Sequence, residues 1–283
     1  MVQLNFIINT IIALGQPEGS VSAITLAFSL MLMPQMAVAQ SAAIASLPTF
    51  SAQVALNKMD EMRSSLASTL RAVLLLAIPA SVGLILLRTP LIQLLYQRGA
   101  FTVRSTELVA WALLWYAAGL VGHSLVEILS RAFYALHDTR TPVFVGAGAM
   151  GLNIGFSLLF SSVFENLGWQ PHGGLALANS LATALESVVL ILLMRKRLKG
   201  LEGVTIWKGV GVSLLGTGVM SLVLLIWRSL LENSSIILLV VGALGLGFMA
   251  YVGLIWLFKT PELTMIFKAL IKKIKRKPLD GQG

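Results

Sequence analysis

The sequence predicts an all-α fold, a polytopic membrane helix bundle of about eight transmembrane helices. Three observations predict it. The chain is 57% hydrophobic and only 12% charged, about half the charged fraction of an ordinary soluble domain. Several apolar runs reach about 20 residues, a length that a bilayer requires and a globular core does not. The basic residues gather in alternate connections between these runs, as they do in membrane proteins.

Eight apolar segments can be drawn as helices. Helices are the economical choice because a lipid-exposed backbone must satisfy its own hydrogen bonds, and the runs lack the alternation of barrel strands. The segments are 4–14, 21–47, 66–87, 108–133, 143–164, 175–194, 210–226 and 236–258.

Local signals bound the segments in order. The first is short and ends at the turn GQPEG, residues 15–19. Pro34 breaks the second and Pro79 lies inside the third, as hinges or as static kinks. The fourth and fifth are joined by the polar stretch LSRAFYALHDTRTPV, residues 129–143, and the sixth ends at the basic run 195–199.

Small residues crowd the fifth segment. Its glycines are Gly146, Gly148, Gly151 and Gly155. Because small side chains let membrane helices approach closely, we interpret this stripe as a packing surface.

The basic residues indicate an orientation. With the N-terminus in the cytoplasm, 17 of the 21 Lys and Arg residues fall on the cytoplasmic side and 4 on the other. This imbalance predicts both termini in the cytoplasm and a multi-pass protein. The formal charge of +9 is therefore interpreted as topology, with no nucleic acid as partner.

The chain divides into three expected parts. Residues 1–200 form a six-helix bundle, 201–260 two additional helices, and 261–283 a basic amphipathic cytoplasmic tail. Apolar residues recur at helical spacing in the tail, and lysines cover the other positions. We expect the tail to bind anionic lipids of the inner leaflet, with a loose solubilising tail as the alternative.

Some polar side chains fall inside the segments. Glu127 and Glu186 are carboxylates at membrane depth, where such groups usually face a cavity or the bundle interior. His123 lies one turn before Glu127, so the two can form a proton relay; alternatively Arg131, one turn after, neutralises Glu127. Arg71 is a further buried cation or a side chain that reaches back to the surface.

Soluble-enzyme chemistry is absent from the sequence. There is no phosphate-binding glycine loop, no HExxH and no GxSxG motif. The 3 histidines are scattered, and there is no cysteine. We therefore expect no enzyme, no metal and no cofactor.

Four stretches, in this order and spacing, resemble the MurJ (MviN) family of lipid II flippases, within the multidrug/oligosaccharidyl-lipid/polysaccharide exporter superfamily. They are EGSVSAITLAF at 18–28, SLPTFS at 46–51, YQRGAFTVRSTELVAWALLWYAAGL at 96–120 and the polar stretch at 129–143. The last resembles a cytoplasmic loop motif of the family, here with Arg131, Asp138, Arg140 and Pro142.

The resemblance implies a fold and a function. Family members have fourteen spans, and the eight here are similar to the seventh to the fourteenth. These are the second lobe plus the last two helices, which in the family line a groove for the lipid tail. The family carries an undecaprenyl-linked peptidoglycan precursor across the bacterial inner membrane by alternating access, without a prosthetic group. A missing first lobe, or a second copy of this chain, would complete the cavity.

The sequence departs from the family at two sites. A family aspartate–arginine pair, implied to engage the diphosphate, is matched here by Phe28 and Ser29. We keep as substrate-cavity candidates the following residues: Ser29, Arg71, His123, Glu127, Arg131 and Glu186.

The second site is the family's sodium site. It is matched here by Asn9, Asn153, Ser157 and Asn179, with no carboxylate. These residues form either a weak cation site or hydrogen bonds between helices.

Three functions remain open. The first is a lipid II flippase-like half that needs a partner lobe. The second is a degenerate, non-transporting membrane subunit or fragment. The third is a superfamily transporter of a less anionic substrate, which the loss of the charge pair at Phe28 and Ser29 also favours.

Overall fold

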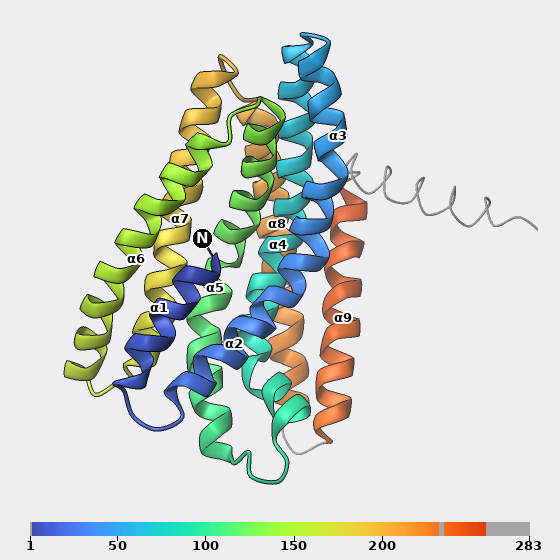
Figure 1. The fold of residues 1–283 in the computed structure, drawn as a ribbon. Helices are drawn as coiled ribbons and strands as arrows, with labels where there is room; N and C mark the ends of the chain where they lie inside the picture. The colour runs from blue at the N-terminus through green and yellow to red at the C-terminus, as the bar shows by residue number, and fades with distance from the viewer. Residues whose placement is uncertain (1, 232–234, 259–283) are drawn as a thin grey trace, which may run out of the picture.

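The structure is a computed structural model that describes residues 2–231 and 235–258, with side chains from residue 7 onward. Those ranges are helical and contain no strand, which confirms the all-α fold (Figure 1). The elements are α1 (Val2–Leu14), α2 (Ser20–Gln35), the π-helical turn η1 (Met36–Gln40), α3 (Ser41–Ala55), α4 (Met59–Tyr96), α5 (Val103–Ala135), α6 (Arg140–Asn166), α7 (His172–Arg197), α8 (Gly203–Leu230) and α9 (Ile236–Leu257). The expected basic tail, 261–283, lies outside the described residues.

The helices run beyond the apolar segments that predicted them. Within the described residues, 7 helical stretches are long and apolar enough to cross a membrane, and α1, with 13 residues, is shorter. The segment expected at 21–47 is part of one stretch, Ser20–Ala55. Pro34 has no N–H, so the helix loses one backbone hydrogen bond there. The wider π-helical turn η1 begins two residues later.

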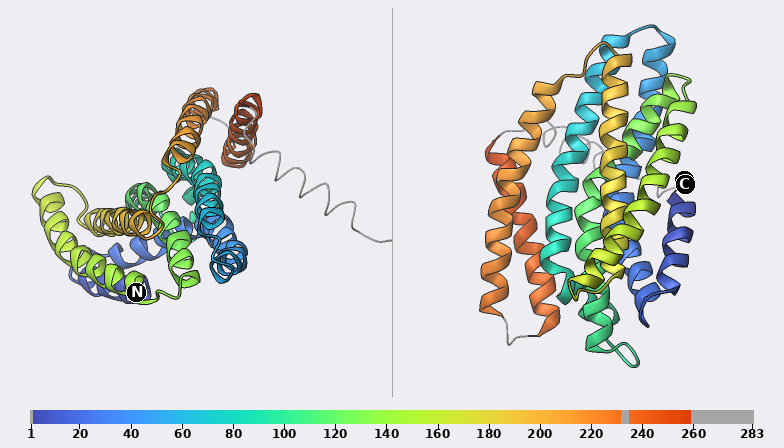
Figure 2. Two further views of the ribbon diagram at one scale, coloured as in Figure 1. Left: turned by 90° about the horizontal axis from the view of Figure 1, so that it is seen from above. Right: turned by 90° about the vertical axis from the view of Figure 1, so that its left-hand side faces the viewer.

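The connections lie at two ends of the bundle (Figures 1 and 2). We call the end with the α3–α4, α5–α6 and α7–α8 loops the basic end, and the opposite one the far end. The described basic residues near the basic end are Lys58, Arg63, Arg131, Arg140, Arg195, Lys196, Arg197, Lys199 and Lys208. Those near the far end are Arg88, Arg98, Arg104 and Arg228.

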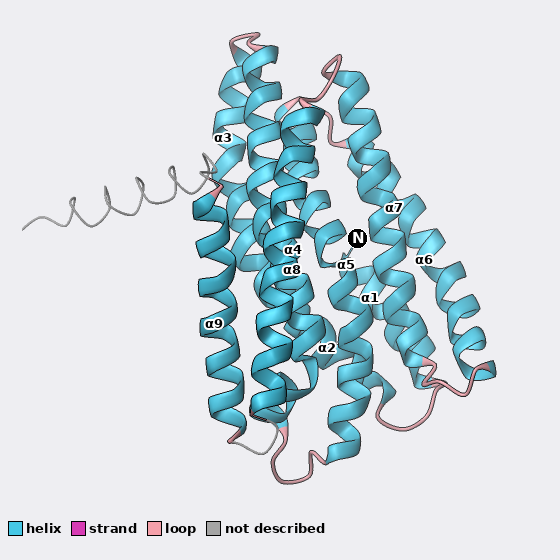
Figure 3. Ribbon diagram, turned by 180° about the vertical axis from the view of Figure 1, so that it is seen from behind, coloured by secondary structure: helices cyan, strands magenta, loops and turns pink. Residues whose placement is uncertain are grey.

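Helix α5 lies at the centre and packs against α2, α3, α4 and α7. Buried apolar side chains form one cluster around α2 and α5, one around α3, α4 and α5, and one between α4, α8 and α9. Helices α8 and α9 stand beside α4, apart from the rest (Figures 2 and 3). Large apolar side chains such as Leu222, Leu225 and Val241 are exposed, as expected for helices in lipid.

Close helix approaches occur at some glycines, although not at most of those of the predicted stripe. A Cβ on Gly174 of α7 would lie 2.6 Å from the backbone of Phe160 in α6. By contrast, Gly148, Gly151 and Gly155 have nothing within 4 Å of such an atom. The packing interpretation of that stripe was wrong for these three, because α6 turns its opposite face, with Gly146, toward the bundle.

Tyr251 connects α9 to α4 at the turn that contains Pro79. A helical carbonyl normally accepts from the N–H four residues later, so Pro79 leaves the Leu75 carbonyl without that partner. The Tyr251 hydroxyl donates to this carbonyl, and it lies 3.0 Å from the Ser213 hydroxyl of α8. One hydrogen-bonded group therefore joins α4, α8 and α9.

Candidate functional site

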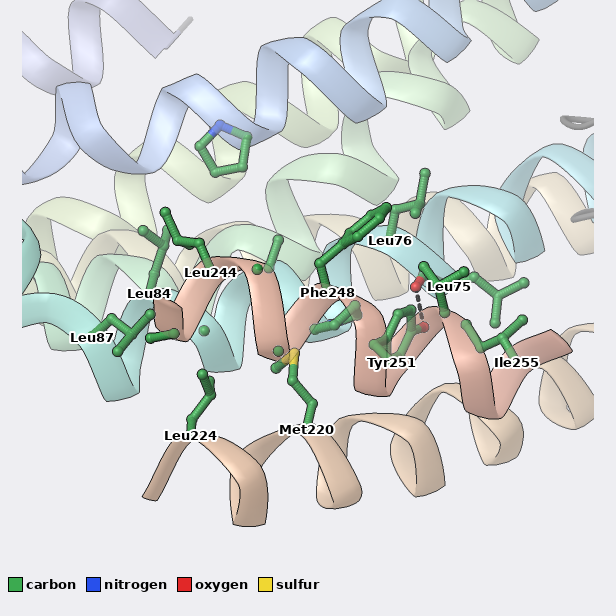
Figure 4. A pocket seen from close by; sticks show the side chains of 18 of the residues that line it. Leu75, Leu76, Leu84, Leu87, Met220, Leu224, Leu244, Phe248, Tyr251 and Ile255 are labelled. Carbon is green, nitrogen blue, oxygen red and sulfur yellow. Dashed lines mark hydrogen bonds between the residues drawn. The ribbon is translucent and has the colours of Figure 1, made fainter. Parts of the chain in front are cut away.

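An apolar groove runs along α4, α8 and α9, with a volume of about 820 Å³ (Figure 4). Its walls carry small residues, among them Ala72, Gly83, Gly245 and Gly247, between leucines. Pro34 of α2 also borders it. An apolar wall of this kind can bind a long hydrocarbon chain. We call it the α4–α8–α9 groove. The resemblance implied a groove for the lipid tail along the last two helices, here α8 and α9, and the lining residues also include α4.

The groove extends along residues 72–91 of α4 and 241–255 of α9, with Met220 and Leu224 of α8. Ala72 and Ile255 line its basic-end part, and Leu91, Leu224 and Val241 its far-end part. Tyr251 is in the wall, so its hydroxyl brings a polar group to an otherwise apolar surface (Figure 4).

Three of the four residues matched to the sodium site meet between α1 and α6. The Asn9 Oδ1 atom accepts from Asn153 Nδ2 at 3.1 Å and from the Ser157 hydroxyl at 3.2 Å. All three side chains are buried. Asn179 lies apart from them and pairs with His123, at 3.0 Å between Oδ1 and Nε2.

Phe28 is buried and packs edge-on against two rings of α5. Its ring centroid is 5.2 Å from that of Tyr116 and 6.2 Å from that of His123. Ser29 is exposed, and its hydroxyl donates to the Thr25 carbonyl of its own helix at 2.8 Å. The position matched to the family arginine therefore faces outward and carries no charge.

Glu127 forms an ion pair within α5. Its Oε1 atom is 2.9 Å from Arg131 Nη2, with side chains 24% and 27% exposed. The Arg131 guanidinium also lies 5.8 Å from the Tyr134 ring centroid. Glu127 was expected either to pair with Arg131 or to form a proton relay with His123. The structure contains the ion pair with Arg131. His123 is hydrogen-bonded to Asn179 instead.

The other two cavity candidates lie elsewhere. Arg71 sits between α4 and α8, where a Cβ on Gly209 would be 2.5 Å from its Cγ. Glu186 is half-buried on α7 and forms no salt bridge with any described residue. The six candidates thus do not form one site.

The loop motif at the α5–α6 connection forms hydrogen bonds at the start of α6. Asp138 accepts from the Thr141 N–H at 3.0 Å and from the Thr141 hydroxyl at 2.8 Å. These bonds hold the pKa of Asp138 below its usual range. Pro142 is buried in the first turn of α6, and Arg140 is exposed at its start.

Asp138→Ala is expected to lower the free energy of unfolding by about 1 kcal/mol, because the first turn of α6 loses its cap. The lowered pKa means that the ionised form stabilises the fold above the unfolded-state pKa. The difference from wild type therefore shrinks as pH falls through the folded-state pKa. Thermal unfolding of purified protein across pH 3–7 checks this. Asp60→Ala, at a 91% exposed side chain, is the control; an equal effect of both variants would contradict the assignment.

No group of three or more His, Asp or Glu residues that could hold a metal ion occurs in the described part of the chain.

The family model for the lipid II flippase MurJ matches residues 1–245. The chain belongs to the MurJ family. A "Probable lipid II flippase MurJ" of Rhizobium tropici is 30% identical over 255 residues, covering 87% of this chain and 46% of that protein. The "Lipid II flippase MurJ" of Burkholderia cenocepacia is 35% identical over 197 residues, covering 70% and 37%. The chain spans less than half the length of these MurJ relatives.

Solved structures agree on the fold. A MurJ lipid II flippase in an inward closed conformation has a TM-score of 0.75 at 24% identity, covering 90% of this chain and 50% of that one. An outward-facing multidrug resistance MATE family transporter of the MOP superfamily has a TM-score of 0.60 at 15% identity, covering 90% and 61%. The MurJ-like membrane bundle expected from the sequence is therefore confirmed.

The sodium ion implied by resemblance to the MurJ family does not fit these residues. A hard cation favours several oxygen ligands with negative charge. Here the cluster offers amides and one hydroxyl, and Asn9 Oδ1 already accepts two hydrogen bonds. These contacts are hydrogen bonds between α1 and α6.

Proposed function

We propose that this chain is the second lobe of a lipid II flippase-like transporter of the bacterial inner membrane. A first lobe would complete the central cavity. The α4–α8–α9 groove carries the proposal, because an apolar channel of about 820 Å³ can hold part of a polyprenyl chain while the headgroup crosses. Membership of the MurJ family supplies the class of substrate.

We propose that the basic end faces the cytoplasm. The described lysines and arginines at that end outnumber those at the far end, as the positive-inside rule requires. The chain has no cysteine, so a thiol reagent labels only the cysteine that is introduced. Thr139→Cys in the α5–α6 loop should resist an external, membrane-impermeant thiol reagent, and Ala100→Cys in the α4–α5 loop should react. The reverse labelling pattern would show that the basic end faces away from the cytoplasm.

A second candidate function follows from Phe28 and Ser29. Phe28 is buried against Tyr116 and His123, and Ser29 has no charge. A surface that lacks an arginine binds a diphosphate weakly, because it lacks the two parallel hydrogen bonds that a guanidinium donates to a phosphate. This favours a superfamily transporter of a less anionic substrate, or a subunit that does not transport.

Rescue of a strain depleted of its own flippase tests the proposal. The chain would be expressed with the first half of the Burkholderia cenocepacia relative, and each half alone would be a control. We expect growth only with both halves. The relative's own two halves, expressed separately, establish that a split transporter can work. No growth with this chain, at normal membrane levels, would favour the second candidate; growth with the chain alone would indicate that a second copy replaces the first lobe.

A further inference from the structure

The α6–α7 loop at the far end, residues 167–171 (LGWQP), contains no charged residue. Two of its apolar side chains are exposed, Leu167 at 58% and Trp169 at 47%. In Figures 1 and 2 this loop lies closer to the middle of the bundle than the α4–α5 loop at the same end, which carries the exposed Arg98. Because α6 and α7 are both long and apolar enough to cross a membrane, the short loop between them lies near the edge of the bilayer.

The first half of the loop pairs its backbone with the end of α6. Gly168 has a φ of 72°, and its N–H donates to the Glu165 carbonyl at 2.9 Å. The Trp169 N–H donates to the Phe164 carbonyl at 2.8 Å. These two bonds form a Schellman turn, which satisfies carbonyls that a helix end otherwise leaves free.

The second half of the loop is bound by side chains of other helices. The Gln170 carbonyl accepts from the Trp111 indole N–H of α5 at 3.1 Å. The Pro171 carbonyl accepts from the Ser161 hydroxyl of α6 at 3.3 Å. Backbone groups that are paired within the protein do not need water, so these parts of the loop can lie among lipids.

Four rings of α5, α6 and the loop form one aromatic cluster, which consists of Trp111, Trp115, Phe164 and Trp169. The Trp169 ring centroid lies 5.5 Å from that of Trp111 and 5.2 Å from that of Phe164. The Trp115 centroid lies 5.5 Å from those of Trp111 and Phe164. The cluster therefore fixes the loop on α5. Tryptophan is enriched at the membrane–water interface because its ring is apolar and its N–H is polar.

We propose that the α6–α7 loop is a membrane anchor, with Leu167 and Trp169 between the phospholipid headgroups and acyl chains of the leaflet at the far end. The exposed Glu165, in the last turn of α6, limits the depth, since a carboxylate in the hydrocarbon core is costly. Through the aromatic cluster, the anchor holds this end of α5, α6 and α7 at a fixed depth. The anchor depends neither on the identity of a substrate nor on a first lobe.

Single cysteines measure the depth of the loop, since the chain has no cysteine of its own. Leu167→Cys reports on the loop, and Ala100→Cys in the α4–α5 loop is the matched aqueous control at the same end. Leu159→Cys, at a 54% exposed side chain of α6 eight residues earlier, is the control within lipid. Each full-length variant is placed in phospholipid nanodiscs and labelled with a bimane fluorophore. The discs contain lipids with a nitroxide either near the headgroup or deep in the acyl chain.

We expect the nitroxide near the headgroup to quench the label at Leu167→Cys more than the deep nitroxide does. The deep nitroxide should quench Leu159→Cys more, and neither should quench Ala100→Cys. Before labelling, a membrane-impermeant maleimide should react with Leu167→Cys about tenfold more slowly than with Ala100→Cys, because the reactive thiolate forms poorly outside water.

Two results would overturn the anchor. Equal reaction rates at Leu167→Cys and Ala100→Cys, without quenching at either, would place the loop in water. Slow reaction at Leu167→Cys without quenching by either nitroxide would show that protein, such as a second copy of the chain, covers the loop. Val163→Cys, at a 39% exposed side chain one turn earlier on the same face, repeats the measurement if Leu167→Cys disturbs the end of α6.

Discussion

Gly174→Ala is expected to destabilise the bundle by about 3 kcal/mol, the upper part of the usual range for overpacking. The added Cβ would lie 2.6 Å from the carbonyl carbon of Phe160 and from the backbone nitrogen of Ser161. Backbone atoms cannot rotate away, so α6 and α7 must separate. The separation would also disturb the Ser161 hydroxyl, which accepts from Gln16 at 3.0 Å.

Gly155→Ala is the matched control for this prediction. It lies on the open face of α6, with nothing within 4 Å of a new Cβ. Alanine should stabilise the helix there by up to about 1 kcal/mol, because it has the higher helix propensity. Thermal unfolding of the purified proteins measures the stability of both variants. The readout is the fraction of protein that remains monodisperse at each temperature. Equal stability of the two variants would show that α6 and α7 are not packed as closely as described.

Gly245→Trp is expected to abolish lipid binding in the α4–α8–α9 groove while leaving the fold intact. Gly245 lines the groove, and a Cβ on it meets nothing within 4 Å. The indole would therefore occupy the space of the ligand without a clash at its base. We expect at least about a tenfold loss of affinity for undecaprenol, which has the polyprenyl chain without the diphosphate, the result of losing most of the apolar area that binds it.

Gly253→Trp is the control on the same helix. Gly253 is exposed, has nothing within 4 Å of a Cβ, and is not among the groove residues. Its indole should lie in the surrounding lipid or detergent and leave binding unchanged. Similar undecaprenol affinity of the two variants would show that the lipid binds outside the groove.

The helices were predictable from the sequence because apolar runs and their polar interruptions are local. Their ends were not: α4 extends from Met59 to Tyr96, well past the apolar run 66–87, since backbone hydrogen bonds continue after the run stops. The glycine stripe illustrates the same limit. Composition could identify small residues on α6, but only the packing shows that Gly174, just outside a predicted segment, makes the close contact.

The site was predictable only where partners share a helix. Glu127 and Arg131, one turn apart, form the pair that their spacing allowed. Contacts between helices, such as Asn9 with Asn153 and Tyr251 with Leu75, depend on distant segments. The groove depends on α4, α8 and α9 together, and no single segment contains it.

Direct transport by the two-lobe assembly tests the central claim. This chain and a first lobe would be reconstituted together in vesicles that carry a fluorescent polyprenyl diphosphate lipid in one leaflet. A membrane-impermeant quencher then reports the fraction of lipid on the outer face over time. We predict fast exchange with both lobes, slow exchange with either lobe alone, and slow exchange when this chain carries Gly245→Trp. Exchange with both lobes no faster than in protein-free vesicles would contradict the assignment of this chain as half of a lipid-linked precursor transporter.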